Sequence, residues 1–486
     1  MIRCTEAMAW TSIFSYVYFM IGAFDGVKEY QIPLYAGLLI AVFTFCEFLS
    51  GMLWAKLADV IGRRWSLLLG CIGCMVTALT FGIASSLWVA LLSRAIGGLS
   101  NPNVGVVNTC VGELAVNKET QARAFSIIPF FRSLGNILGP VLGGFLAEPN
   151  KRFPELFSQN IWRLYPFLLP NFAISFLALL GFLLGLLFLR ETHPGFLDRR
   201  SLYDKIASRT LDVQYSSVAR VDYQDAEELD RLGEDQRMDP DEGEASIPKP
   251  PVDPETRLGS GREHQPIQVK GVITTQVWLQ IASVCSLAYH KVSSDVIIPT
   301  FLALPAKGRP ESTRIQARGP GVEGGFGLDA REIGLILFSQ AIVAIAAQAC
   351  LIPNLVARFG ALRTYKWILR GYPVLYILTP FTAQLVSPLS VVAVSSDLWL
   401  KVVVSSTAYV CSNILITNTT PDRMSLAKVN GVAASLGCLA RAIGPSLSGQ
   451  ILTWSMKSHH LELAFWGLSL VALAGTAESF FLRDQP

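Results

Sequence analysis

Charged side chains are scarce in this sequence. Asp, Glu, Lys and Arg make up 16% of its 486 residues, whereas a soluble globular domain carries about 25%. The uncharged residues come in long blocks, and 51% of the chain is hydrophobic. These blocks indicate a lipid bilayer rather than a larger soluble core. The net charge of +3 gives no reason to expect a nucleic-acid partner.

Other signals are also missing. The chain has no Walker-type phosphate loop, so ATP is not expected to drive its activity directly. No cluster of residues typical of a soluble enzyme is present, and we expect neither an enzyme nor a cofactor. Cys71 and Cys74 form the one C-x-x-C pair, but they lie in an apolar segment without a second ligand pair. They are expected to be packing residues rather than a metal or redox site. The first apolar run continues into DGVKEY without a small-residue cleavage site, so no cleavable signal peptide is expected.

Apolar runs long enough to cross a membrane recur along the chain. A membrane-spanning helix needs about 20 predominantly apolar residues. Between the sixth and seventh runs, residues 191–270 are polar, with an acidic stretch at 222–244, and this segment is expected to be a largely disordered linker. The prediction is an all-α integral membrane protein with 12 transmembrane helices, in which 1–190 and 276–486 form six-helix bundles joined by a linker at 191–275. The twelve runs cover residues 7–24, 33–55, 66–84, 87–110, 124–147, 165–189, 276–304, 332–353, 366–385, 398–417, 429–455 and 461–482.

An internal repeat supports two related halves. The segment NILGPVLGGFL at 136–146 resembles RAIGPSLSGQIL at 441–452. Each lies in the fifth span of its half, so we expect a parallel, pseudo-symmetric duplication. The matched positions are Gly139 with Gly444, Pro140 with Pro445 and Gly144 with Gly449.

A short polar turn separates the second and third spans. The stretch GMLWAKLADVIGRRWSLLLG at 51–70 places Asp59, Gly62, Arg63 and Arg64 between two apolar runs. This pattern resembles the G-x-x-x-D-x-x-G-R-[RK] loop of major facilitator superfamily transporters, with Ala55 and Val60 as departures from it. The resemblance implies a conformational latch at the membrane surface. Asp59 is expected near the N-terminal end of the third span, where the helix dipole favours a carboxylate. The alternative is an ordinary solvated loop with basic residues on the inner side.

Two further residues belong to this part of the chain. Glu113, at the cytoplasmic end of the fourth span, is expected to join the latch. Arg94 lies inside the fourth span, four residues before Gly98. That pair resembles the R-x-x-x-G motif associated with proton transfer in drug:proton antiporters. The alternative is an arginine that snorkels to the outer interface.

The fifth span resembles the antiporter signature G-x-x-x-G-P-x-x-G-G. Its glycines allow neighbouring backbones to approach closely, and its proline is expected to bend the helix. The resemblance favours export over import, although plain helix packing explains the same residues. The positions are Gly135, Gly139, Pro140, Gly143 and Gly144, with Gly444 and Pro445 as their copy in the eleventh span.

The seventh span contains His290, Lys291 and Asp295. The sequence around them resembles zinc-induced-facilitator-like and tetracycline-exporter-like carriers, which implies proton coupling or substrate contact. Lys291 and Asp295 are four residues apart and can pair on a helix, so a structural ion pair is the alternative. Glu47 is a further acid within the second span. Arg441, in the eleventh span, is expected either to line the cavity or to pack against the fifth span's copy.

These resemblances together cover nearly the whole chain apart from the linker. They imply a carrier of the drug:proton antiporter type that exports a small organic solute or drug in exchange for protons by alternating access. Its partners would be the solute, protons and the lipid bilayer, and the protein would be a monomer with cytoplasmic termini in the plasma or vacuolar membrane. One alternative is a facilitator or symporter for a metal chelate, siderophore or nutrient. An alternative of another class is a non-transporting membrane sensor with the same fold.

Overall fold

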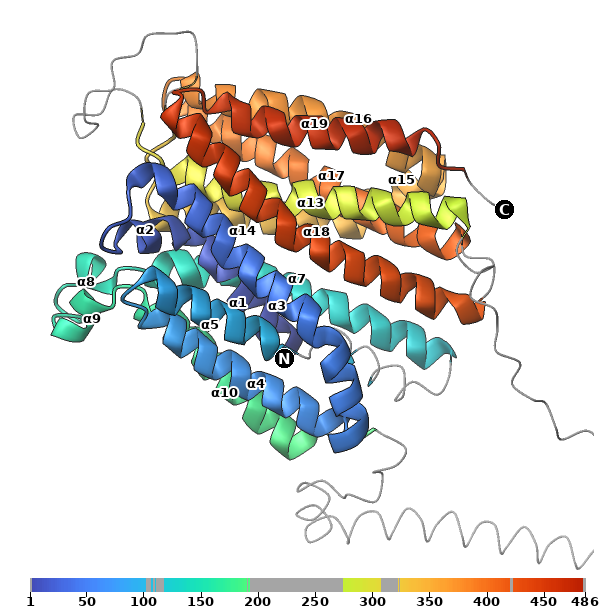
Figure 1. Ribbon diagram of the computed structural model, residues 1–486, viewed down its shortest axis with the longest axis horizontal. Coiled ribbons are helices and arrows are strands. Elements are labelled where there is room, and N and C mark those ends of the chain that lie inside the picture. Colours follow the sequence, from blue (N-terminus) through green and yellow to red (C-terminus); the bar gives the residue numbers. More distant parts are fainter. Residues whose placement is uncertain are drawn as a thin grey trace, which may run out of the picture. The chain divides into compact units, whose positions relative to one another are not determined.

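The computed structural model in Figure 1 describes residues 2–101, 106–107, 110, 118–189, 191–192, 274–306, 322, 324–419 and 423–483. These residues belong to one compact unit, and their regular structure is helical. Nearly all of the predicted linker at 191–275 lies outside the described residues, so the domain boundaries stay a prediction. Each of the twelve apolar runs contains helical residues.

The first half consists of helices that follow the predicted runs. A short 3₁₀ turn, η1, separates α1 from α2 within the first run. In chain order the elements are α1 (Ile2–Ser12), η1 (Ile13–Ser15), α2 (Val17–Gly22), η2 (Glu29–Gln31), α3 (Ile32–Ile61), α4 (Arg63–Gly82), α5 (Leu87–Leu99), α7 (Lys118–Leu146), α8 (Pro149–Arg152), α9 (Asn160–Leu164) and α10 (Leu168–Phe188).

The second half repeats this pattern. A π-helical segment, η5, continues α14 into α15. In chain order the elements are α13 (Thr275–Ala303), α14 (Ala330–Ala346), η5 (Ala347–Leu351), α15 (Ile352–Phe359), α16 (Ala361–Leu378), η6 (Thr379–Gln384), α17 (Leu389–Thr419), α18 (Arg423–Lys457) and α19 (Glu462–Ser479).

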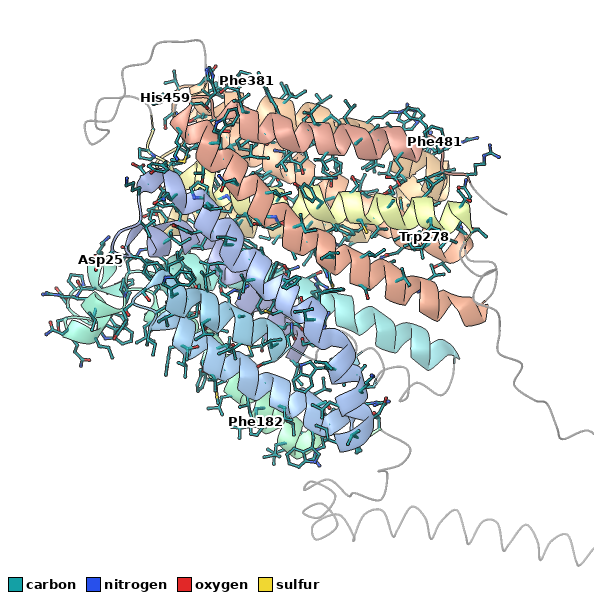
Figure 2. The ribbon with its side chains drawn as sticks, in the orientation of Figure 1. Asp25, Phe182, Trp278, Phe381, His459 and Phe481 are labelled. Atoms are coloured by element: carbon teal, nitrogen blue, oxygen red, sulfur yellow. The ribbon has the colours of Figure 1, made fainter. Side chains whose placement is uncertain are left out.

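Five helical stretches within the described residues are long and apolar enough, by length and composition, to cross a membrane. The long helices α7, α13 and α18 are not among them, and the sequences of α13 and α18 include charged residues that line the interior. Large apolar side chains also face outward, as expected for surfaces in contact with lipid. Figure 2 labels three of them: Trp278 (49% exposed), Phe381 (39%) and Phe481 (68%). The five stretches are Glu29–Gly51, Arg63–Gly82, Leu168–Phe188, Ala330–Phe359 and Leu389–Thr419.

The two halves meet through two matching helix pairs, α3 with α18 and α7 with α14. In the second pair, a Cβ on Gly144 would lie 2.5 Å from the carbonyl oxygen of Ala330, and one on Gly334 would lie 2.6 Å from that of Pro140. In the first pair, a Cβ on Gly449 would overlap the carbonyl of Pro33. Gly144 and Gly449, equivalent in the sequence repeat, therefore make equivalent contacts across the interface.

The remaining glycines of the repeat hold each half together. Gly135, Gly139 and Gly143 leave no room for a Cβ against the backbone of α1. In the second half, a Cβ on Gly444 would lie 2.6 Å from Ser293 Oγ on α13. The fifth span of each half thus packs against the first helix of its own half and an element of the other. Helix α7 continues through Pro140, whose carbonyl oxygen accepts a hydrogen bond from Ser15 Oγ at 2.9 Å.

Candidate functional site

A cavity of about 810 Å³ lies between the two halves and is lined by both. Sites for organic ligands typically have volumes of roughly 300–1,000 Å³. Aromatic rings form much of its apolar wall, and amide and charged groups form the remainder. The aromatic lining residues are Trp10, Phe14, Phe43, Phe81, Tyr372, Tyr376 and Tyr409.

Glu47 projects from α3 into this cavity. Its Oε1 accepts a hydrogen bond of 2.9 Å from the side-chain amide of Asn101, which also donates to Glu6 at 3.4 Å. Glu6 is in turn paired with Arg3 at 2.6 Å. The other charged groups that act on Glu47 are Arg132 and Arg441. The predicted intramembrane acid is therefore the centre of a polar cluster to which five helices or their ends contribute.

Arg94 is 8% exposed and also lines the cavity. Its Nε donates to the carbonyl of Leu39 at 3.3 Å, and its guanidinium lies 4.1 Å from the ring centre of Phe43 and 5.8 Å from that of Trp10. Contacts of this kind stabilise a cation over an aromatic face. The side chain is thus enclosed by α1 and α3, unlike an arginine that snorkels to the membrane interface.

Lys291 and Asp295 form the ion pair that their spacing on α13 predicts. Lys291 Nζ contacts both carboxylate oxygens of Asp295, at 2.6 Å for Oδ2. Both side chains line the cavity and are partly exposed, at 20% and 32%. The coupling role predicted for Asp295 therefore involves a carboxylate that already has a cationic partner.

His290 points away from this pair. It is 1% exposed, its Nδ1 is 3.0 Å from the hydroxyl of Tyr376, and its ring meets that of Tyr372 edge-on at 4.6 Å. His290 does not line the cavity, but both tyrosines do. Any hydrogen-bonded link between His290 and a transported solute would pass through the hydroxyl of Tyr376.

A second ion pair was not predicted. Lys401 and Asp397, on α17, are 2.8 Å apart, with side chains 6% and 8% exposed. Thr379 donates to Asp397 at 3.0 Å, and Lys401 lies 5.1 Å from the ring centre of Tyr376. The same four-residue spacing that predicts the Lys291 pair is present here, but the predicted tenth span at 398–417 does not include Asp397.

The latch differs from the expectation in one respect. Asp59 lies in the last turn of α3 and pairs with Arg63 Nη1 at 2.5 Å, so it is not at the start of the third span. The carboxylate at that helix N-terminus is Glu191, just after α10, which accepts backbone N–H bonds from Arg63 (2.8 Å) and Arg64 (3.2 Å). The reason is that α3 continues to Ile61, beyond its apolar run.

Gly62 is needed at this junction for two reasons. Its φ is +96°, a conformation that residues with a Cβ avoid, and a Cβ would overlap the Glu191 carboxylate. Arg64 extends the link by donating to the carbonyl of Leu186 at 2.7 Å. The latch therefore ties the end of α10 to the start of α4. Glu113 lies outside the described residues, and its predicted part in the latch stays a prediction.

Arg441 lines the cavity, which is the first of the two positions expected for it. Its backbone carbonyl accepts a hydrogen bond of 3.3 Å from Thr44 on α3, not from the fifth span. Its Nη2 donates to Cys438 Sγ at 2.8 Å. Arg132 on α7, which the sequence analysis did not single out, also lines the cavity. Like Arg94, it is an arginine within an apolar run, and that signal could have identified it.

The part of the chain described by the structure contains no group of three His, Cys, Asp or Glu side chains that could hold a metal ion. The pair Cys71 and Cys74 consists of free thiols. Cys74 lines the cavity beside apolar residues. The polar groups available to a ligand are therefore carboxylates, cations, amides and hydroxyls.

Two pseudo-symmetric helix bundles around a polar cavity define the class of secondary transporters built from parallel repeats. The chain belongs to the Major Facilitator Superfamily, whose model matches residues 3–233. It is a multi-pass integral membrane transporter of small molecules, not an enzyme.

Comparison with individual proteins agrees with this assignment. The chain is 36% identical to the major facilitator superfamily multidrug transporter mfsB of Aspergillus fumigatus, covering 99% of this chain and 82% of that protein. It is 25% identical to ZINC INDUCED FACILITATOR 1 of Arabidopsis thaliana, covering 97% of this chain and 87% of that protein. Among solved structures, a bacterial homologue of the human lysosomal transporter Spinster, inward-facing and occupied, matches with a TM-score of 0.65 at 13% identity, over 99% of this chain and 94% of that one.

Proposed function

We propose that this protein exports a small organic solute in exchange for protons by alternating access. One observation carries the proposal: each half contributes a carboxylate, Glu47 and Asp295, to a single cavity between the halves. A charged side chain at the centre of a membrane costs at least about 2.5–3.5 kcal/mol. Such acids therefore mark ion or substrate pathways, and protonation changes the charge that a solute meets.

The two acids differ in their surroundings. Asp295 has Lys291 as a direct partner, so its negative charge is balanced within its own helix. Glu47 accepts its hydrogen bond from the neutral amide of Asn101 and shares the surrounding arginines with Glu6. Protonation of Glu47 would alter the charge balance of several helices at once. Glu47 is therefore the stronger candidate for the coupling site, with Asp295 second.

Alternating access requires that the two halves rock about the cavity. The glycine contacts between α3 and α18 and between α7 and α14 join the halves closely without interlocking side chains. In the predicted orientation these contacts lie at the outer end of the cavity. If these contacts break while the inner end of the cavity closes, the cavity opens to the outer side of the membrane.

Two observations support export. The glycine and proline residues of α7 follow the antiporter-like pattern, and a relative that is matched over 82% of its length is described as a multidrug transporter. The protein would act as a monomer in the plasma or vacuolar membrane, with protons as the coupling ion.

One observation favours a second candidate. The ion pair with Lys291 balances the charge of Asp295 within α13. Proton coupling at Asp295 would then be weakened, as in a facilitator for a metal chelate, siderophore or nutrient.

Transport by purified protein in liposomes under an imposed pH gradient tests the proposal. Wild type would be compared with Glu47→Gln and Asp295→Asn, using a panel of cationic and anionic dyes and metal chelates. Asp25→Asn is the matched control, because Asp25 is exposed in the loop after α2 and does not line the cavity (Figure 2).

The proposal expects the pH gradient to drive solute in the direction opposite to the proton flux. This movement should fail in Glu47→Gln but not in Asp25→Asn. Movement in the same direction as protons would establish the symporter instead. Transport unaffected by the gradient would establish a facilitator. If no solute moves under any condition, a non-transporting sensor is the better account.

A further inference from the structure

The arginine content of the cavity wall indicates the charge of the solute. Four arginines line it, Arg3, Arg94, Arg132 and Arg441, against two glutamates, Glu6 and Glu47. The two lysines of the wall do not alter this balance, because each is paired with its own aspartate on the same helix. Over the described residues, the cavity wall therefore carries an excess of positive charge.

Several of these arginines have donors that no described residue satisfies. Arg3 Nε, Arg94 Nη2 and Arg441 Nε are buried without a hydrogen-bond acceptor within the described part of the chain. A buried donor without a partner is destabilising, and more so when it is charged. Arg94 is 8% exposed and its guanidinium borders the cavity, so an acceptor supplied by a ligand would offset this cost.

Arg132 and Arg441 line the cavity from opposite halves. Arg132 comes from α7 in the first half and Arg441 from α18 in the second, and Tyr409 of α17 lines the same cavity. Arginine binds carboxylate, sulfonate and phosphate groups through paired N–H donors.

The remainder of the wall fits an apolar body. Trp10, Phe43 and Tyr372 supply aromatic faces, and Trp10 and Phe43 already cover Arg94. We propose that the solute is a soluble amphipathic organic anion whose acidic group is held between Arg132 and Arg441 while its ring system packs on the aromatic wall. This inference rests on the transport function proposed above, but not on the direction of proton movement.

A cationic solute of the same shape would meet like charge at both arginines and bind more weakly.

Dye binding to purified protein in detergent tests this inference without any requirement for coupling. The probes are sulforhodamine B, a xanthene dye with a net negative charge, and rhodamine 6G, a cation on the same scaffold. Fluorescence polarisation would give Kd for wild type, Arg132→Gln and Arg441→Gln. Arg370→Gln is the matched control, because Arg370 is exposed on α16 and does not line the cavity.

We expect sulforhodamine B to bind wild type more tightly than rhodamine 6G. Each cavity arginine variant should weaken its binding about 10-fold or more, since hydrogen bonds to charged groups contribute about 1.5–3 kcal/mol. Arg370→Gln should leave it unchanged. If the glutamine variants do not fold, Arg132→Lys and Arg441→Lys can replace them. Both keep the positive charge, so their Kd for sulforhodamine B should rise less than about 10-fold.

The inference is overturned if sulforhodamine B does not bind, if rhodamine 6G binds more tightly, or if the arginine variants bind like wild type. Failure of the proposed function is distinct from these outcomes. Gradient-driven transport of rhodamine 6G would leave proton exchange intact and refute the anion. Anion binding without any proton movement in liposomes would support the anion and refute proton exchange.

Discussion

Gly37 and Pro445 are in close backbone contact across the interface between the two halves of the transporter. A Cβ at Gly37 on α3 would overlap the carbonyl oxygen of Pro445 on α18. The equivalent contact on the other side of the interface joins Gly334 to Pro140. Because small residues allow two helix backbones to approach, these contacts define how tightly one end of the cavity is closed.

Gly37→Ala should therefore weaken the closed end. The new methyl group meets backbone rather than a flexible side chain, and overpacking of this kind costs about 1–3 kcal/mol. We expect a shift towards the state in which this end is open, measured as faster labelling of a cysteine placed at Leu337, which lines the cavity. Gly51→Ala lies on the same helix with open space around it and should label like wild type.

The Lys291–Asp295 pair can be assigned a role by a double-mutant cycle. Lys291→Ala and Asp295→Ala should each lower the thermal midpoint, and the double variant should recover part of it, with a coupling energy of about 0.5–3 kcal/mol. If the pair is only structural, transport in the double variant should recover together with its stability. If Asp295 carries the coupled proton, stability recovers but proton-dependent transport does not.

Glu191 should be as important as the arginines of the latch, because it caps α4. Glu191→Ala leaves the backbone N–H groups of Arg63 and Arg64 without this acceptor, and loss of such a cap costs about 0.5–2 kcal/mol. A lower thermal midpoint is expected than for Glu155→Ala, whose side chain is exposed in the loop after α8. Equal midpoints for the two variants would show that the cap contributes nothing.

The fold could largely be predicted from the sequence, and the reason is physical. A bilayer requires runs of apolar residues, and a duplicated half repeats its helix-packing glycines, so both leave local patterns. The pairing of Lys291 with Asp295 was predictable on the same basis, since it depends only on spacing within one helix. The position of Asp59 was not, because α3 extends beyond the apolar residues that defined its run.

The cavity could be predicted only in part. Glu47, Arg94 and Arg441 stand out as charges within apolar runs, and all three line it. The contact of Asn101 with Glu47 depends on the relative rotation of α3 and the end of α5, which no local pattern encodes. The same holds for Glu191, which lies far along the chain from the α4 residues that it caps.

The unpredicted pair of Lys401 and Asp397 should be mainly structural. Breaking a buried pair leaves one uncompensated charge and costs about 3–5 kcal/mol, whereas replacing both partners with apolar residues is often nearly neutral. Lys401→Met should thus be strongly destabilising, and Lys401→Met combined with Asp397→Leu much less so, as measured by thermal unfolding in detergent. A double variant that is stable but inactive would instead assign Lys401 to solute binding, since it lines the cavity.

The direction of proton movement during solute transport is the most direct test of this account. Protein in liposomes with a trapped pH indicator and a clamped membrane potential would be given solute on one side, with wild type beside Glu47→Gln. The account predicts that protons move opposite to the solute, and that Glu47→Gln loses this proton movement. Protons that travel with the solute, or proton movement unchanged in Glu47→Gln, would contradict it.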